Sequence, residues 1–205
     1  MHTEILPPGY PQAILRAQAL IQGGELVAFP TDTVYGLGAA INYPQAIDRL
    51  YAVKGRDTAK AIAVLIGSLD DLPQVACNMN QSALRLAERF WPGPLTLVLA
   101  RQSGLPENLS PLPTIGVRMP DHPVALALLQ QTGPLAVTSA NLSGRPSTIT
   151  AQQVYQQLGG LIPLIIDGGQ TPGGQPSTVV DCTNPEPAIL RAGPILLEDI
   201  QAELG

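Results

Sequence analysis

The chain contains few cysteines, few lysines and no long hydrophobic run. With only Cys77 and Cys182 among 205 residues, it has neither a disulfide framework nor the cysteine spacing of a metal site, so we expect a reduced, cytoplasmic protein. No apolar run approaches the roughly 18–20 residues of a transmembrane helix, and the first residues lack the basic and apolar stretches of a signal peptide. We therefore expect no membrane association and no secretion.

The sequence also lacks the residues of common nucleophilic and metal-dependent sites. Its two histidines are His2, near the start, and His122, at a predicted helix start where a capping role is expected. There is no Ser-His-Asp set, no cluster of metal ligands and no convincing pair of carboxylates. An enzyme with this sequence would work by positioning substrates and stabilising charge. That strategy suits nucleotidyl transfer, in which the ligand supplies the reactive groups and Mg²⁺ assists.

Basic residues are scarce and unevenly distributed. The net charge is −5 and only 13% of residues are charged, which argues against a broad nucleic-acid-binding surface. The only two lysines, Lys54 and Lys60, flank Arg56. Arg118 and Arg191 fall in or beside predicted strands. Such a concentration of positive charge in an acidic protein indicates a local anion site.

Hydrophobic periodicity predicts an α/β fold. We expect helices at 11–21, 44–55, 82–90, 121–133 and 150–158, a short helix capped by Ser68 and Asp71, and strands at 26–29, 61–66, 95–100, 114–119, 135–138, 164–166, 178–181 and 189–191. About eight strands that alternate irregularly with helices favour an open mixed sheet with flanking helices. Because there is no internal repeat or long linker, we expect a single domain over residues 1–205.

Polar residues directly follow several predicted strands. Examples are 30–35 (PTDTVY), 114–118, 138–141 and 177–178. Ligands of open α/β sheets collect outside strand ends, so we expect these segments to share one crevice. The glycine-rich segment 167–176 is a candidate lid or hinge, and plain disorder is the alternative.

Two pairs of polar residues have i, i+2 spacing. If Lys54–Arg56 is extended, both cations point the same way and an anion such as phosphate would lie between them; the alternative is a cationic helix C-terminus favoured by the helix dipole. Ser139 and Asn141 would likewise face one side, with groups that both donate and accept hydrogen bonds. The alternative for this second pair is ordinary turn chemistry.

Charged residues in apolar surroundings give a second indication of a ligand. Arg118 and Arg191 each lie in a strand of small and apolar residues. A buried charge needs a partner, which a ligand carboxylate or phosphate would provide; a solvent-facing edge position is the alternative. Thr31, Asp32, Thr33 and Tyr35 would bind the amine and hydroxyl of an amino acid. The alternatives for Asp32 are that it binds an ammonium group or a metal, or only caps a turn.

A series of motifs, in order, resembles the YrdC-like L-threonylcarbamoyladenylate synthases. They are FPTDTVYGLG at 29–38, KGR at 54–56, WPGPLT at 91–96, GVRMP at 116–120, TSANLSG at 138–144, PSTVVD at 176–181 and RAG at 191–193. The match runs from about residue 10 to about residue 197. Several ordered motifs over this span are far more specific than any one alone.

The resemblance implies an open, twisted α/β sheet around a large, concave, basic cavity. It also implies that L-threonine, bicarbonate or CO₂ and ATP, the last with Mg²⁺, react to give threonylcarbamoyl-AMP and pyrophosphate. Downstream threonylcarbamoyl-transferase proteins would use the product to make N6-threonylcarbamoyladenosine on tRNA beside the anticodon; direct tRNA contact by this protein is left open. The C-terminal domain of longer relatives is expected to be absent, so the 167–176 loop would supply any lid.

The resemblance also assigns expected roles to individual residues. The family's signature tetrad corresponds to Lys54, Arg56, Ser139 and Asn141, the expected catalytic residues. The expected threonine site consists of Thr33, Arg118, Thr138, Ser177 and Thr178, and the expected ATP site of Arg56, Lys60, Thr114, Ala140, Thr148 and Arg191. No protein ligand to a metal is expected. Two positions depart from some relatives, since Lys60 stands where some carry Asn and Leu65 where some carry His.

Two other functions remain open at this point. The concave face of a non-catalytic module would bind tRNA or double-stranded RNA, although the chain has no broad basic surface. A carbamoyl-transfer domain would use carbamoyl phosphate, although no acylphosphatase-like or zinc-finger segment accompanies it.

Overall fold

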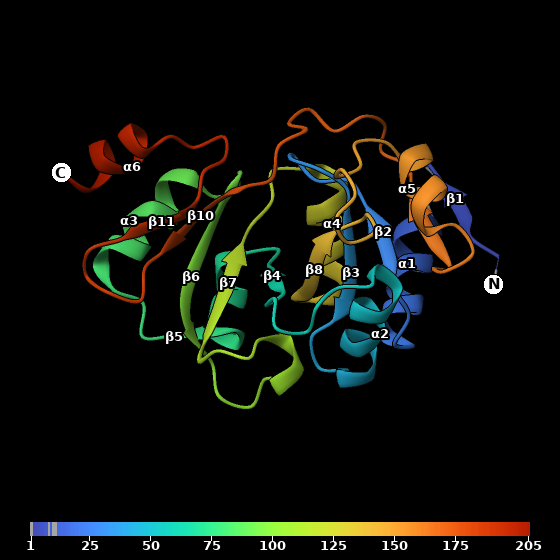
Figure 1. Cartoon of the computed structure of the whole chain (residues 1–205), viewed down its shortest axis with the longest axis horizontal. Helices are drawn as coiled ribbons and strands as arrows, with labels where there is room; N and C mark the ends of the chain where they lie inside the picture. Colours follow the sequence, from blue (N-terminus) through green and yellow to red (C-terminus); the bar gives the residue numbers. More distant parts are fainter. Residues whose placement is uncertain (1, 8, 10–11) are drawn as a thin grey trace.

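The computed structural model describes residues 2–7, 9 and 12–205 of the chain (Figure 1). Its α-helices are α1 (Gln12–Gln22), α2 (Pro44–Lys54), α3 (Gln81–Phe90), α4 (Pro123–Thr132), α5 (Ala151–Leu158) and α6 (Leu197–Leu204), with 3₁₀ helices η1 (Leu69–Gln74) and η2 (Glu107–Leu109). The strands are β1 (Glu4–Leu6), β2 (Val27–Phe29), β3 (Gly36–Ala40), β4 (Ala63–Leu65), β5 (Ala76–Cys77), β6 (Leu95–Arg101), β7 (Thr114–Arg118), β8 (Leu135–Ser139), β9 (Leu164–Ile166), β10 (Thr178–Asp181) and β11 (Ala188–Arg191). The predicted α/β class is confirmed.

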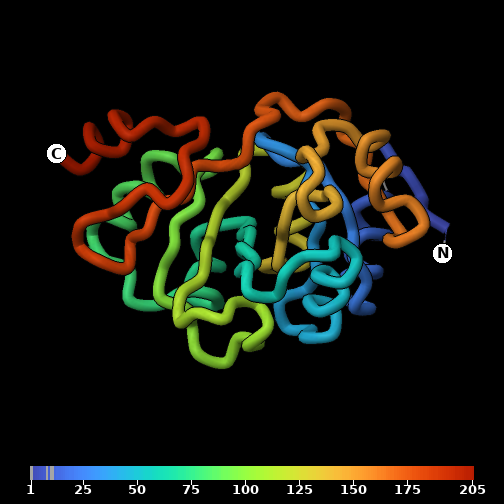
Figure 2. The backbone as a smooth tube through the Cα atoms, viewed as in Figure 1, coloured from blue at the N-terminus to red at the C-terminus, as the bar shows by residue number. Residues whose placement is uncertain are grey.

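All the strands found in the described residues belong to one mixed sheet. Its order is β1-β9-β2-β3-β8-β4-β7-β6-β10-β11, and β5 pairs with β6 outside this path. It combines parallel pairs, such as β4 with β7 and β6 with β10, with antiparallel pairs, such as β3 with β8. Figure 2 shows the N- and C-termini at opposite ends of the long axis. Because most neighbouring strands in this order are not consecutive in the chain, segments far apart in sequence are neighbours in the sheet.

Several local sequence signals act as predicted. Helix α2 starts with Pro44 and ends at Gly55, whose φ of 58° is the left-handed C-cap conformation. Ser68 and Asp71 form a capping box at η1. The Nδ1 atom of His122 accepts a hydrogen bond from the backbone N–H of Val124 at 3.2 Å, which confirms the capping role.

Five elements were not predicted: β1, β3, β5, η2 and α6. The polar segment 30–35 was expected at a ligand crevice with no strand after it, but residues 36–40 form a buried strand between β2 and β8. The glycines serve packing there, because a Cβ atom on Gly36 would lie 2.8 Å from Cγ1 of Val137. Pro11, the predicted first residue of the first helix, lies outside the described residues.

Two apolar clusters fill the space between the sheet and its helices. One cluster joins α1 and α4 to the sheet through residues such as Ala17, Ile21 and Leu128, and it includes Leu65 and Val137. The larger cluster contains buried residues of α2, α3 and α5 together with alternate residues of the strands. Within the described part of the chain, no helix is long and apolar enough to cross a membrane.

Candidate functional site

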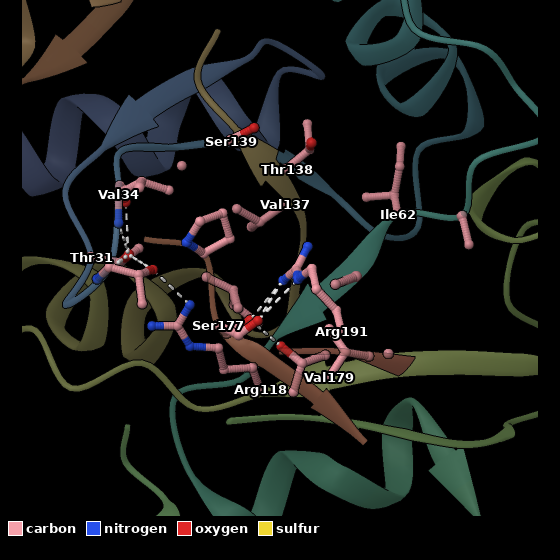
Figure 3. A pocket seen from close by; sticks show the side chains of 18 of the residues that line it. Thr31, Val34, Ile62, Arg118, Val137, Thr138, Ser139, Ser177, Val179 and Arg191 are labelled. Atoms are coloured by element: carbon pink, nitrogen blue, oxygen red, sulfur yellow. Dashed lines mark hydrogen bonds between the residues drawn. The ribbon is translucent and has the colours of Figure 1, made fainter. Parts of the chain in front are cut away.

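A cavity of about 320 Å³ opens on one face of the sheet (Figure 3). Its wall includes pairs of residues from or next to five strands: Ala63 and Leu65, Thr96 and Val98, Gly116 and Arg118, Val137 and Ser139, and Ser177 and Val179. Each pair has i, i+2 spacing, and alternate residues of a strand share a face. The cavity lies beside the α1–α4 cluster, because Leu65 and Val137 belong to both.

Arg118 is buried in the cavity wall and is held by three protein groups. Its Nε donates to the carbonyl of Gly93 at 3.0 Å and its Nη1 to Oγ1 of Thr33 at 2.9 Å. Its Nη2 forms an ion pair with Asp32, whose carboxylate also accepts the N–H of Asp121. A guanidinium has five N–H donors, so one N–H on Nη1 and one on Nη2 remain for a ligand. Asp32 therefore fixes Arg118 instead of capping a turn.

Arg191 reaches the cavity from the edge strand β11. Its Nε and Nη2 donate to the carbonyl of Ser177 at 3.0 and 2.8 Å, and Nη2 also donates to Oγ of Ser177 at 3.1 Å. Oγ of Ser177 lies 2.7 Å from Oγ1 of Thr96. These contacts join β6, β10 and β11 at the cavity, and Arg191 lines the wall although it lies on an edge strand.

The cavity-lining arginines influence one another electrostatically. Desolvation and then nearby Arg56 lower the pKa of Arg191. Burial lowers the pKa of Arg118, Asp32 raises it and Arg191 lowers it again. Arginine still stays protonated near neutral pH. An anion among these guanidinium groups would relieve their repulsion.

Of the two interpretations of Lys54–Arg56, the structure confirms the cationic helix C-terminus, and the extended segment is wrong. Lys54 is the last residue of α2, and the left-handed Gly55 turns the chain after it. The ammonium of Lys54, which is only 3% exposed, donates to the carbonyls of Ser139 and Asn141. Arg56 lines the cavity, and its Nε and Nη2 donate to the carbonyls of Lys60 and Ala61 at 3.3 and 3.0 Å. Burial, followed by Arg56, lowers the pKa of Lys54 to about 8.

The i, i+2 pair Ser139 and Asn141 also separates in space. Ser139 lines the cavity. The amide nitrogen of Asn141 instead donates to the carbonyls of Leu142 and Arg145 at 2.9 and 2.7 Å, while its buried Oδ1 has no hydrogen-bond partner among the residues that the structure describes. Of the predicted tetrad, the structure therefore brings Arg56 and Ser139 to the cavity wall, with Lys54 and Asn141 behind them.

The other predicted site residues divide in the same way. Thr33, Arg118, Thr138, Ser177 and Arg191 line the cavity. Thr178, Lys60, Thr114, Ala140 and Thr148 do not line it. Lys60 is exposed and Thr114 is half-buried. Thr178 is fully buried and bonds Ile195; Thr148 is also buried and donates to the carbonyl of Ala140 at 3.0 Å. We call the buried non-lining residues the supporting layer: Lys54, Ala140, Asn141, Thr148 and Thr178.

Thr31 and Tyr35, which were expected to hold an amino acid, line the cavity, whereas sequence reasoning missed Thr96, a further hydroxyl residue of the wall. Oγ1 of Thr31 bonds Oγ1 of Thr33 at 3.0 Å and the carbonyl of Val34 at 2.7 Å. Thr96 lies inside the WPGPLT motif, as the second residue of the predicted strand 95–100. A polar residue at the start of an apolar strand was the signal that could have identified it.

The glycine-rich segment 167–176 packs along the edge of the cavity. The hydroxyl of Tyr35 donates to the carbonyl of Gly169 at 2.7 Å, and Gly174 N–H donates to the carbonyl of Thr33 at 2.9 Å. Pro176 lines the cavity. The segment thus contacts the threonine-rich turn of the wall; its role as a lid stays a prediction.

The cavity-lining residues offer Mg²⁺ no carboxylate ligand. Proteins usually bind this ion through one or two carboxylates and substrate phosphates. No group of three His, Cys, Asp or Glu residues suited to a metal occurs in the described ranges. The residues present therefore do not fit a protein-held Mg²⁺ site, and an Mg²⁺ ion would need ATP phosphates as its ligands.

Comparison with known proteins gives consistent matches. A family model for Sua5, YciO and YrdC proteins, described as telomere recombination, matches residues 19–193. The threonylcarbamoyl-AMP synthase of Pyrococcus abyssi is 44% identical over 191 residues, which are 92% of this chain and 56% of that protein. The enzyme of the same name from Bacillus subtilis is 44% identical over 209 residues, with 99% and 59% coverage.

A solved structure agrees with these matches. The crystal structure of P. abyssi Sua5 complexed with L-threonine has a TM-score of 0.91 and 43% identity, covering 94% of this chain and 57% of that chain. The chain thus spans less than two thirds of the length of these relatives. The resemblance seen in the sequence is confirmed, and the chain belongs to the Sua5/YciO/YrdC family.

Proposed function

We propose that this protein is an L-threonylcarbamoyladenylate synthase, which converts L-threonine, bicarbonate or CO₂ and ATP into threonylcarbamoyl-AMP and pyrophosphate. Relatives with 44% identity are named threonylcarbamoyl-AMP synthase, and a P. abyssi relative forms a complex with L-threonine. The observation that carries the proposal is the convergence of Arg56, Arg118 and Arg191 on one cavity rich in hydroxyl groups.

The reaction needs no protein nucleophile. The amine of threonine forms an N–C bond with CO₂ and loses a proton to give a carbamate. A carbamate oxygen then forms a bond to the α-phosphorus of ATP, and the bond from that phosphorus to the bridging oxygen breaks, which releases pyrophosphate. Positioning of the reactants and stabilisation of charge are the contributions left to the protein.

The charged and hydroxyl-bearing residues named next have specific roles in the proposed reaction. The two remaining N–H groups of Arg118 bind the threonine carboxylate as a fork. Arg56 and Arg191 offset negative charge on the ATP phosphates. Ser139, Thr138 and Thr33 supply neutral donors and acceptors on the wall. Mg²⁺ enters only as an ion carried by the ATP phosphates.

The product is proposed to serve N6-threonylcarbamoyladenosine formation on tRNA, through downstream threonylcarbamoyl-transferase proteins in the cytoplasm. The alternative of a non-catalytic RNA-binding module is not favoured. Phosphate contacts to RNA require cations spread over a surface, whereas these arginines face a cavity of about 320 Å³.

A pyrophosphate-release assay tests the proposal. Release should require L-threonine, bicarbonate and ATP together, and the R191A variant should lose most of it while R101A, altered outside the cavity wall, keeps it. Release that continues unchanged without threonine would refute the proposed reaction. A parallel arm with carbamoyl phosphate in place of threonine and bicarbonate tests the carbamoyl-transfer alternative.

A further inference from the structure

Thr96 and Ser177 form a buried pair of hydroxyl groups in the cavity wall. Each residue is 5% exposed, and their oxygens lie 2.7 Å apart although 81 residues separate them in sequence. Both line the cavity. Figure 3 shows Ser177 between Arg118 and Arg191 in this view, with dashed contacts to Arg191. The pair thus lies where the guanidinium groups of the wall approach one another.

The number of available protons limits what this pair can do. A hydroxyl group donates one proton and accepts through two lone pairs. Arg191 occupies one lone pair of the Ser177 hydroxyl through a contact of 3.1 Å. If Thr96 donates to Ser177, both lone pairs of Ser177 are occupied and its own proton must find another acceptor. If Ser177 donates instead, the proton of Thr96 is left over.

In the described part of the chain, the Thr96 hydroxyl has Oγ of Ser177 as its sole hydrogen-bond partner, and Oγ of Ser177 has the Thr96 hydroxyl and the Arg191 guanidinium, which only donates. No protein acceptor for the leftover proton is therefore found there. One hydroxyl proton is therefore available to whatever occupies the cavity. Donation from the cationic Arg191 polarises Ser177 and strengthens its proton as a donor. A group that only accepts hydrogen bonds, such as a carboxylate or phosphate oxygen, matches this arrangement.

We propose that Thr96 is a positioning residue that donates to Ser177 and so directs the Ser177 hydroxyl proton toward an anionic oxygen in the cavity. This inference rests on the proposed function, which supplies two sources of such an oxygen: the carboxylate of L-threonine and the phosphates of ATP. Thr96 acts through Ser177, and its own methyl group packs toward Gly116, where an added Cβ atom would lie 3.2 Å from Cγ2 of Thr96.

Calorimetric titration of the full chain with L-threonine and, separately, with ATP tests the proposal. The T96V variant keeps the shape of the side chain and loses the hydroxyl. It should bind one of the two ligands roughly five- to tenfold more weakly, the effect of about one hydrogen bond. The ligand that loses affinity identifies the source of the anionic oxygen. T96S, which restores the hydroxyl, should bind close to wild type, as should T132V, a control at the end of α4.

A double-mutant cycle separates positioning from direct contact. If Thr96 acts only by orienting Ser177, T96V should have little further effect in an S177A background. Wild-type affinity of T96V for both ligands would overturn the proposal, as would an effect of T96V that persists in S177A or a T96S variant as weak as T96V. If T96V does not fold, the same affinities are measured for T96A, with and without S177A.

The two proposals fail in different ways. A wild-type protein that binds threonine or ATP but releases no pyrophosphate contradicts the proposed function, while the affinity comparison among Thr96 variants still decides the role of Thr96. A wild-type protein that binds neither ligand contradicts both.

Discussion

The cavity wall and the supporting layer use the same residue types for different purposes. In the wall, Arg118 and the Thr96–Ser177 pair keep N–H or O–H protons that no described protein group accepts. In the supporting layer, Lys54 and Thr178 direct their donors at backbone carbonyls. Hydrogen-bond donors left free in the wall are available to a ligand, whereas donors in the supporting layer bind backbone carbonyls and hold the backbone of the wall in position.

Arg118 lines the wall and is also bound to Gly93, Thr33 and Asp32, so its replacement should have the largest effect. R118Q removes the charged fork and leaves the Asp32 carboxylate, whose side chain is only 11% exposed, without its cation. Loss of one partner of a buried ion pair costs about 3–5 kcal/mol. We expect the free energy of unfolding in urea to fall by about this amount, and titration to detect no threonine binding.

The double variant R118Q/D32N sharpens the comparison between wall and support. It removes both charges, so it should recover most of the stability that R118Q loses without recovering threonine affinity. Normal threonine affinity in either variant would show that Arg118 supports the wall and does not bind the ligand.

A smaller effect is expected from a substitution behind the cavity wall that removes no wall residue. Gly193 lies against the backbone of Ser177 and Thr178, and a Cβ atom there would be 2.6 Å from the Ser177 carbonyl carbon. G193A should lower the free energy of unfolding by about 1–3 kcal/mol and weaken ligand binding, because the backbone at Ser177 must shift. G9A is the matched control, since an added Cβ atom on Gly9 meets nothing within 4 Å. A G193A protein with unchanged stability and affinity would contradict the close approach.

The smallest expected effect is a pH dependence from Lys54. Its pKa is about 8 in the folded protein, below the ordinary 10.5, so between these values the unfolded chain binds more protons and stability rises with pH. The difference in unfolding free energy between wild type and K54M should grow by about 1 kcal/mol from pH 8 to pH 9. The neutral amine keeps two N–H donors for its two carbonyl partners. A difference that stays constant over this range would exclude the lowered pKa.

The sequence predicted the class of fold and the residues around the cavity better than their orientations. Strand periodicity identified the segments that carry Arg118, Ser139 and Ser177. The i, i+2 spacing gives Lys54 and Arg56 a shared direction only in an extended chain, and Lys54 ends a helix, as the predicted helix over 44–55 implied. The sequence did not reveal the partners of the Lys54 ammonium, because the carbonyls that bind it come from β8 and the turn after it, more than 80 residues away.

Strand β3 and Asp32 illustrate a second limit. The sequence GLGAA has little strand propensity, yet it forms a central strand because its glycines make room for Phe29 and Val137. Asp32 was interpreted as a ligand-binding or turn-capping residue, whereas it pairs with Arg118, which is 86 residues away. In both cases the deciding contact is tertiary, so a single sequence does not reveal it.

The wall joins distant parts of the chain, and this has a consequence for synthesis and turnover of the protein. Thr33 and Arg118 meet across 85 residues, and Thr96 meets Ser177 across 81. A nascent chain lacks a complete cavity until β11 pairs with β10 at the outer edge of the sheet. Because a ligand that binds only the complete cavity stabilises only the folded state by mass action, such a ligand would protect mature molecules from proteolysis and leave incomplete ones unprotected.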